Sequence, residues 1–176
     1  ELHNRVARPV SWGLDAGVYW VAYEWLTGSH LGGIVQAEGL PLIARSFEIA
    51  AQVVEGLEIL TGLDIPHLCI SPASIFICQD GSVRILHAGW SHMLLHCVDG
   101  PAHPNLMSNL PFLAPEVAGM KSGQSFEADV FSVASNLFFL FTGQPTHWTD
   151  DPVHLAQAIA TVRPVMMPLQ NALDEE

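Results

Sequence analysis

The sequence predicts a mixed α/β fold of the α+β kind, in which short antiparallel strands and longer helices occupy separate stretches of the chain. Strand-like runs at 6–12 and 18–25 surround a glycine-bearing turn, and a second pair at 74–78 and 82–86 surrounds an Asp-Gly turn. Elsewhere, apolar residues recur at spacings of three and four, which is the helical period. The 176 residues are enough for one domain with a real core.

The first half of the chain is expected to form a hairpin followed by helices. Segment 13–17 carries two glycines and an aspartate, which suits a tight reversal. A short helical piece is expected near 31–35, before a Gly-Leu-Pro punctuation. A longer helix is expected over 42–60, with Gly62 as its C-terminal cap. Its apolar face consists of Phe47, Ala50, Val53, Val54, Leu57 and Leu60.

The second half is expected to form the second hairpin, a loop and two helices. A proline-bearing loop from about 89 to 115 leads to a helix that runs to about Phe141. The carboxylate of Asp129 can cap the start of this helix, and Gly143 can end it. A final helix is expected over 152–162, with proline in its first turn. The remaining tail is expected to be irregular.

The composition restricts the partners. The chain has 6 basic and 18 acidic residues and a formal charge of -12, which argues against binding to nucleic acid or to an anionic membrane surface. Only 14% of residues are charged and 49% are hydrophobic. Either much of the surface is buried within the chain, or apolar surface is left for protein partners. We favour protein partners.

The compartment is expected to be reducing. Cys69, Cys78 and Cys97 form no even framework and no Cys-x-x-Cys motif. No signal peptide is visible at the start, and the most apolar stretch, 130–141, is too short to cross a bilayer. We therefore expect no membrane insertion and an intracellular, soluble protein of the cytoplasm or an organelle matrix.

Four collinear motifs resemble landmarks of the protein kinase-like superfamily in a degenerate and truncated form. They are Ile65 to Ile77, with His67-Leu68-Cys69 inside it, then His87-Ala88-Gly89, Ala114-Pro115-Glu116 and Asp129-Val130-Phe131-Ser132. The resemblance spans about 6–148. It implies a protein kinase-like fold that is mainly the helical large lobe (C-lobe), with a residual hairpin and hinge from the small lobe (N-lobe). The implied division is 1–28 for these small-lobe strands and hinge, 29–163 for the large lobe and 164–176 for the irregular tail.

The hinge residues follow from the same resemblance. Residues 21–28 look like the last small-lobe strand leading into the hinge. Tyr23 then takes the gatekeeper position, and Glu24, Trp25 and Leu26 would offer backbone groups to an adenine ring. The alternative reading of this segment is a simple amphipathic strand.

The resemblance also implies that catalytic groups are replaced in the His-centred loop. Cys69 stands where the family has the Asp that orients the substrate hydroxyl, and an ordinary thiol with a pKa of about 8.5 does not supply a carboxylate's charge. Leu68 replaces the Arg that pairs with a phosphorylated activation loop. Ser71 replaces the phosphate-contacting Lys, and Ser74 replaces a magnesium-binding Asn.

A similar replacement affects the metal position. His87 stands where the family's Asp binds magnesium, which prefers hard oxygen ligands. Structural landmarks are retained at Gly89, Pro115 and Glu116, although the Arg that usually pairs with this Glu has no counterpart in the sequence. Asp129 is expected to accept hydrogen bonds from the backbone of the loop around His67, which the resemblance makes a structural residue.

The function implied is that of a catalytically inactive pseudokinase domain, a protein-interaction or scaffold subunit of a larger assembly. We expect no cofactor, no metal and no ATP binding. Two alternatives stay open. One is nucleotide binding without turnover. The other is a metal or thiol site that reuses His67, Cys69 and His87, with His92, His96 and Cys97 as further ligand candidates.

Overall fold

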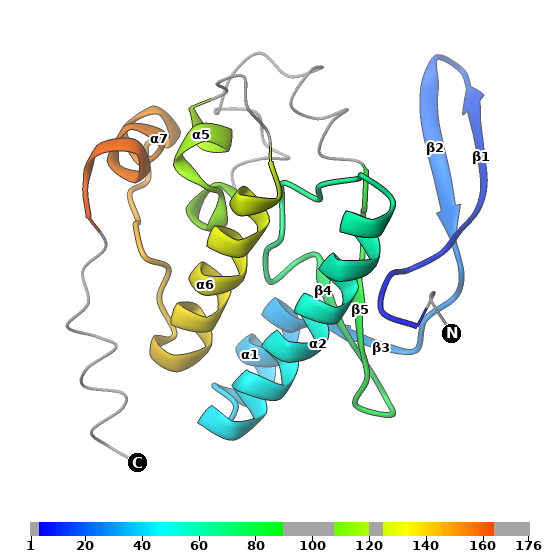
Figure 1. Ribbon diagram of the computed structural model, residues 1–176, viewed down its shortest axis with the longest axis horizontal. Helices are drawn as coiled ribbons and strands as arrows, with labels where there is room; N and C mark the ends of the chain where they lie inside the picture. The colour runs from blue at the N-terminus through cyan, green and yellow to red at the C-terminus, as the bar shows by residue number, and fades with distance from the viewer. Residues whose placement is uncertain (1–3, 90–107, 120–124, 164–176) are drawn as a thin grey trace.

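The computed structural model describes residues 4–89, 108–119 and 125–163, and it combines short strands with longer helices (Figure 1). The strands are β1 (Pro9–Asp15), β2 (Val18–Tyr23), β3 (Gly28–His30), β4 (Ile75–Cys78) and β5 (Val83–Ile85). The helices are α1 (Leu31–Glu38), α2 (Ile43–Gly62), η1 (Leu110–Phe112), α5 (Pro115–Ala118), α6 (Phe126–Thr142) and α7 (Pro152–Thr161). This combination confirms the predicted fold class. The predicted tail and most of the predicted proline-bearing loop lie outside the described residues.

The first hairpin, β1 and β2, forms a two-stranded sheet of its own, which projects from one side of the molecule (Figure 1). Its turn has positive φ at both central residues, 47° at Ala16 and 81° at Gly17. Two left-handed residues in a two-residue loop match the right-handed twist of the flanking strands. The hairpin predicted from the sequence is therefore confirmed, with β1 extending further toward the turn than expected.

The second sheet joins β3, β4 and β5 in antiparallel order. Gly28, at the start of β3, has a φ of 149°, and a Cβ there would lie 2.1 Å from the carbonyl oxygen of Ile77. Close approach of the two strands therefore requires glycine at this position. The N-terminal segment adds to the far side of β5, where Val6 bridges Ile85 in parallel.

Two apolar clusters form the core. The first lies between α2, α6 and the second sheet, and α2 and α6 run side by side in Figure 1. The second joins the loop around Leu68 to η1, α5, α6 and α7. The site loop at 67–74 contributes Ile70 to the first cluster and Leu68 to the second, so both clusters position it.

The end of α2 differs from the prediction. The helix includes Gly62, and Leu63 is its C-cap, so the prediction that Gly62 caps the helix is wrong. The left-handed residue that follows is Asp64, with a φ of 58°. Aspartate tolerates this conformation better than most residues because its short side chain bonds locally. The chain thus leaves the helix two residues later than a glycine cap would place it.

The start of α6 also differs. The helix begins at Phe126 after Ser125, so Asp129 lies in the first turn and does not cap it. Gly143 ends the helix with a φ of 72°, as predicted. The predicted last helix is confirmed as α7, where the carboxylate of Asp151 accepts hydrogen bonds from the N–H groups of Val153 and His154. No helix in the described ranges is long and apolar enough to span a bilayer.

Candidate functional site

The site is organised by Asp129, which projects from the first turn of α6 into the loop that precedes β4. One carboxylate oxygen accepts the N–H of His67 at 2.7 Å, and the other accepts the N–H of Leu68 at 2.6 Å. These are the bonds expected from the sequence. Burial raises the pKa of Asp129 to about 6, although the two N–H bonds act in the opposite direction.

The two hydrogen bonds of Asp129 hold the backbone at Leu68 in a strained conformation. Leu68 has a φ of 64°, a conformation that is costly for a bulky side chain. Its side chain is fully buried in the second apolar cluster. The carboxylate of Asp129 therefore fixes a backbone shape that Leu68 would otherwise leave.

His67 is a buried neutral imidazole whose tautomer follows from its partners. Its Nε2 lies 2.8 Å from the carbonyl oxygen of Leu86, so Nε2 carries the proton and donates. Its Nδ1 accepts the N–H of Cys69 at 3.3 Å. Burial lowers the pKa of His67 to about 4; the bond to Leu86 acts against this shift, and the nearby His87 adds a smaller part to it. His67 thus joins the loop to the segment after β5.

Cys69 is packed into the second apolar cluster and is 9% exposed. Burial and, to a smaller extent, the charge of Asp129 raise the pKa of its thiol to about 12. A thiol of this kind stays protonated near neutral pH, so Cys69 is neither a carboxylate substitute nor an activated nucleophile.

The polar groups of Ser71 and Ser74 are used in hydrogen bonds within the loop and to Asn109. The hydroxyl of Ser74 accepts the N–H of Ser71 at 2.9 Å and faces the carbonyls of Ser71 and Cys69 at 3.1 and 3.3 Å. The hydroxyl of Ser71 donates to the side chain of Asn109 at 2.7 Å. Both serines are buried. They stabilise the turn before β4 and leave no free oxygen directed toward a ligand.

Asn136 is a residue of this site that the sequence reasoning missed. From α6, its Nδ2 donates to the carbonyl of Ile70 at 3.2 Å and to that of Ser132 at 2.7 Å. Asn136 therefore holds the loop at a second point, about two helical turns beyond Asp129 on the same face of α6. The available sequence signal was its spacing of seven residues from Asp129, which places both on one helical face.

His87 and Tyr23 meet at the other side of the site. Their rings contact edge to face with centroids 6.3 Å apart. His87 has a φ of 65°, and Gly89, two residues later, has a φ of 81°. Partial burial of the imidazole lowers the pKa of His87 below its usual value. A neutral imidazole beside an aromatic ring is a poor ligand for magnesium.

The predicted hinge residues differ in their side-chain contacts and exposure. Glu24 is tied to Arg8 twice: its N–H donates to the Arg8 carbonyl at 2.9 Å, and its carboxylate accepts the Arg8 N–H at 3.0 Å. Trp25 is 93% exposed, and Leu26 is partly buried. The role of the backbone groups of Glu24, Trp25 and Leu26 as a hinge stays a prediction.

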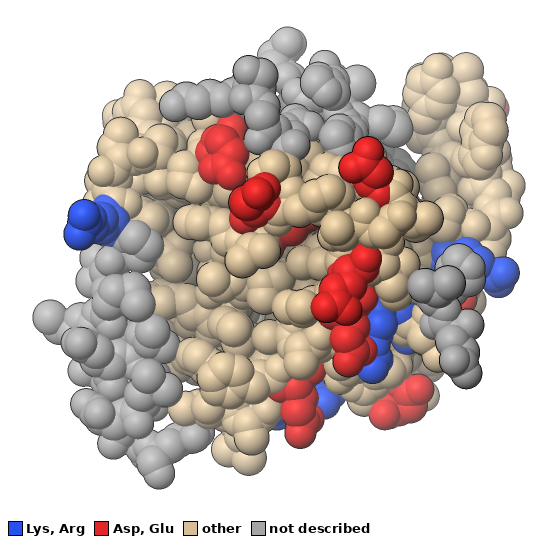
Figure 2. All heavy atoms as spheres, viewed as in Figure 1, with Lys and Arg blue, Asp and Glu red and all other residues tan. Residues whose placement is uncertain are grey.

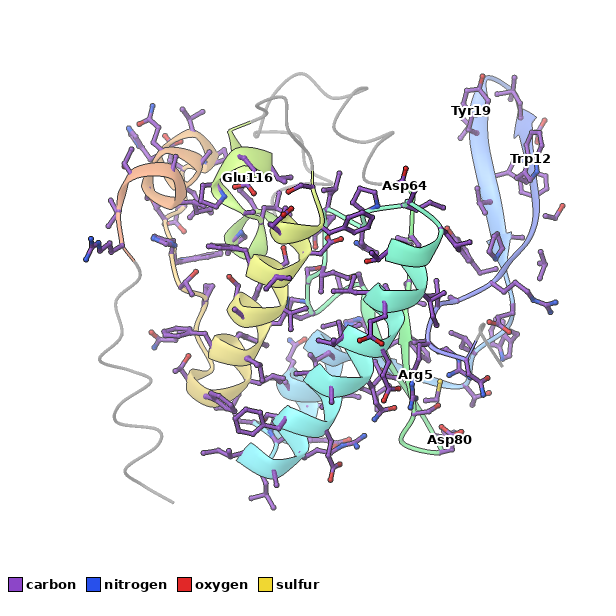
Figure 3. All side chains as sticks on the ribbon, in the orientation of Figure 1. Arg5, Trp12, Tyr19, Asp64, Asp80 and Glu116 are labelled. Carbon is purple, nitrogen blue, oxygen red and sulfur yellow. The ribbon has the colours of Figure 1, made fainter. Side chains whose placement is uncertain are left out.

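Pro115 and Glu116 begin α5, and Glu116 is labelled in Figure 3. Glu116 is partly buried, and none of the ion pairs within the described ranges includes it. Its partial exposure to solvent lowers the cost that a fully buried unpaired carboxylate would carry.

The metal alternative has no assembled ligand set in the described part of the chain, where no group of three or more His, Cys, Asp or Glu side chains converges. His67 and Cys69 are committed to packing and backbone bonds, as shown above. His92, His96 and Cys97 lie outside the described residues.

Comparison with known proteins places this arrangement in a family. The model of the family described as "Protein kinase domain" matches residues 2–175, so the chain belongs to the protein kinase domain family. The fold agrees: the solved structure of Rad53 1–466 in complex with AMP-PNP superposes with a TM-score of 0.73 at 23% identity. That match covers 97% of this chain and 42% of the Rad53 chain.

Curated relatives are bacterial kinases. Serine/threonine-protein kinase PknB of Mycobacterium leprae is 26% identical over 139 residues, a match that covers 78% of this chain. Serine/threonine-protein kinase AfsK of Streptomyces coelicolor is 29% identical over 154 residues, or 84% of this chain. The matches span only 22% of PknB and 17% of AfsK.

Proposed function

We propose that this chain is a kinase-like domain that does not transfer phosphate and serves as a protein-interaction module within a larger assembly. The observation that carries the proposal is Cys69. At the position that the family resemblance gives to the catalytic Asp, a buried thiol with a pKa of about 12 offers no charge to orient a hydroxyl.

The other replaced positions support the same conclusion. His87 offers imidazole in place of a hard oxygen ligand, and it contacts Tyr23 instead of pointing into free space. The hydroxyl of Ser74 bonds within its own loop, and that of Ser71 bonds to Asn109. Meanwhile Asp129 and Asn136 keep the loop in one shape. The frame that positions a kinase loop is thus maintained without the charges that act on ATP.

The interaction role is supported by exposed apolar surface. One face of the first hairpin carries Trp12 at 78% exposure, Tyr19 at 65% and Leu14 at 58%. A groove of about 650 Å³ lies elsewhere on the molecule. It is lined mainly by apolar residues, among them Pro72, Pro111, Phe112, Phe139, Pro145 and Trp148. Exposed apolar patches of this kind mark interaction sites.

Phosphate transfer is tested with the purified chain, radiolabelled ATP and magnesium, with and without a general protein substrate. We expect no incorporation above that of a heat-denatured sample. Magnesium-dependent incorporation that Cys69→Ser or His87→Ala abolishes, while the control Cys78→Ser leaves it intact, would overturn the proposal.

Two further measurements separate the alternatives. A thermal unfolding midpoint that does not move with ATP in large excess is expected, since bound nucleotide would stabilise the fold by mass action. A shift without incorporation would support nucleotide binding without turnover. Size measurement of the chain alone and with co-purifying proteins tests the interaction role, and a dispersed monomer with no associate counts against it.

A further inference from the structure

A polar pocket of about 510 Å³ lies away from the site loop, between the N-terminal segment, α2 and the β4–β5 turn. Arg5 and Asp80, which mark two sides of this region, are labelled in Figure 3. Apart from Ile59, the residues around it are polar: Asn4, Arg5, Glu55, Asp80, Ser82 and Arg84. The pocket shares no residue with the loop that Asp129 holds.

The pocket gathers scarce positive charge. The whole chain has 6 basic residues against 18 acidic ones, and two of the six line this pocket. Figure 2 shows acidic side chains scattered over the visible face and few basic ones, some of them directly beside acidic ones. Two guanidinium groups and the two carboxylates of Glu55 and Asp80 make this pocket formally neutral, in a chain whose overall charge is strongly negative.

Arg5 is already paired. Its Nε donates to the carboxylate of Glu55 at 2.6 Å, and its Nη1 donates to the side chain of Gln52 at 2.5 Å. These bonds fix the guanidinium against α2. The Arg5 side chain, held in this way, forms one side of the pocket.

Arg84 is the unusual group. Its Nη2 makes one long bond of 3.3 Å to the side chain of Asn4, and its Nε is buried without a partner. No ion pair in the described ranges includes it. The nearby Asp80 is bonded to Ser82, whose N–H and hydroxyl donate to one of its oxygens at 2.9 and 2.7 Å. The Nε is enclosed by the protein, so a ligand in the pocket can reach only the Nη groups, whose one bond to Asn4 is long. An oxyanion is a good partner for such a group.

We propose that Arg84 and Arg5 form a binding site for an oxyanion, the shared chemistry of a phosphate group and a carboxylate. The planar fork of Arg84 presents several N–H donors to two oxygens, and Arg5 closes the other side. Glu55 and Asp80 limit the charge that the pocket accepts, so it takes a single small anionic group. This inference does not depend on the proposed function, because the site lies outside the kinase-like loop.

The test titrates the chain with sodium phosphate and, separately, with sodium acetate. Ionic strength is held constant with sodium chloride, and the backbone amide signals of 80–84 are followed by NMR. We expect saturable shifts of these signals. Saturation by phosphate alone identifies phosphate as the source, and saturation by both anions extends the site to carboxylates.

Two substitutions with opposite expected signs make the test specific. Arg84→Gln should weaken anion binding about tenfold or more, because a charge-assisted hydrogen bond accounts for about a decade in affinity. Glu55→Gln should tighten binding severalfold, since it removes a negative charge beside Arg5. A merely structural role for Arg84 would not produce this opposite pair.

The control is Arg163→Gln, which removes an exposed charge away from the pocket and should leave the titration unchanged. The thermal unfolding midpoint of each variant without added anion reports whether it is folded. Should Arg84→Gln fail to fold, Arg84→Lys retains the charge but not the planar fork and should still bind phosphate more weakly than the wild type. Unsaturable shifts with both anions, or equal affinities of the wild type and the Arg84 variant, overturn the proposal.

Discussion

Asp129 satisfies two peptide N–H groups that lie too deep for solvent, and it does so at a loop whose backbone is strained at Leu68. In Asp129→Asn, one carbonyl oxygen can accept one N–H, while the new NH₂ group faces the other. We expect this change to lower the free energy of unfolding by about 2 to 3 kcal/mol, since a buried donor loses a charge-assisted bond. Urea denaturation measures the loss.

The control for this change is Glu127→Gln in the same turn of α6, where the side chain is exposed. It removes one negative charge from the helix start without breaking the loop bonds. We expect it to alter stability by about 0.5 kcal/mol at most. Equal losses in the two variants would mean that charge at the helix start matters, and not the bonds to the loop.

Two buried groups of the site change the stability in opposite directions as the pH falls. The pKa of His67 is lowered to about 4 in the folded state, so stability is lost as the pH falls from about 6.5 toward 4, where only the unfolded chain binds the proton. The pKa of Asp129 is raised to about 6, so the folded chain binds a proton as the pH falls from 6 toward 3.8, and stability is gained. Their contributions oppose each other between about pH 4 and 6.

The substitution His67→Gln removes the contribution of His67 to the pH dependence of stability. Compared with the wild type, the variant should gain unfolding free energy progressively as the pH is lowered from 6 to 4, although it is less stable at pH 7 through lost packing. Urea denaturation at several pH values measures the difference between the two proteins. A difference that stays constant with pH would show that His67 does not titrate as its burial requires.

At the scale of elements, α2 contains two glycines with opposite surroundings. A Cβ at Gly56 would lie 2.6 Å from the buried side chain of Ile85 and 3.2 Å from the carbonyl oxygen of Arg5. At Gly62 a Cβ would meet nothing within 4 Å. The first glycine permits close packing of α2 on β5 and the N-terminal segment, and the second only weakens the helix.

Alanine substitutions should therefore have opposite signs. Gly56→Ala should destabilise by about 1 to 3 kcal/mol through overpacking, even though alanine favours the helix. Gly62→Ala should stabilise by up to about 1 kcal/mol, because it lowers the entropy of the unfolded chain. Thermal unfolding of the two variants side by side tests this, and a gain at both positions would show that Ile85 can move aside at little cost.

The sequence predicted which elements form better than where they end. The periodic apolar face of α2 and the turn residues of both hairpins are local signals, and they identified the correct element types. The ends depend on competing partners: Asp129 was expected to cap α6 and also, from the family resemblance, to bond to the loop around His67. Its carboxylate makes only the loop bonds, to N–H groups 61 and 62 residues away in sequence. The bonds of Arg5 to Gln52 and Glu55 have the same long range, so no local pattern reveals them.

The candidate site was predictable where a family motif fixed it and not where packing decided it. The motif placed Cys69 and His87 at catalytic positions. It did not indicate that Cys69 is buried in an apolar cluster or that His87 contacts Tyr23. The burial of Cys69 depends on which apolar residues of η1, α5 and α7 meet the loop. The contact of His87 depends on where β2 places Tyr23. Both are set by segments far apart in the chain.

At the scale of the whole molecule, the first hairpin is separate from both apolar clusters. Trp12 pairs with Val21 and Leu14 pairs with Tyr19 across the two strands, so these side chains share one face. A two-stranded hairpin is weakly stable alone, and here its apolar face is exposed. We therefore expect the exposed aromatic residues on it to contribute little to the stability of the fold.

The double variant Trp12→Ser and Tyr19→Ser tests this separation. Because both side chains are exposed, we expect a change of at most about 0.5 kcal/mol in unfolding free energy for each, together with reduced binding of a hydrophobic dye by the folded protein. The contrasting variant is Ile49→Ala, which removes a side chain that is 4% exposed in the first cluster and should cost about 2 to 5 kcal/mol. A loss in the hairpin variant as large as that of Ile49→Ala would show that the hairpin folds as part of the core. In that case its exposed face could not be assigned to a partner.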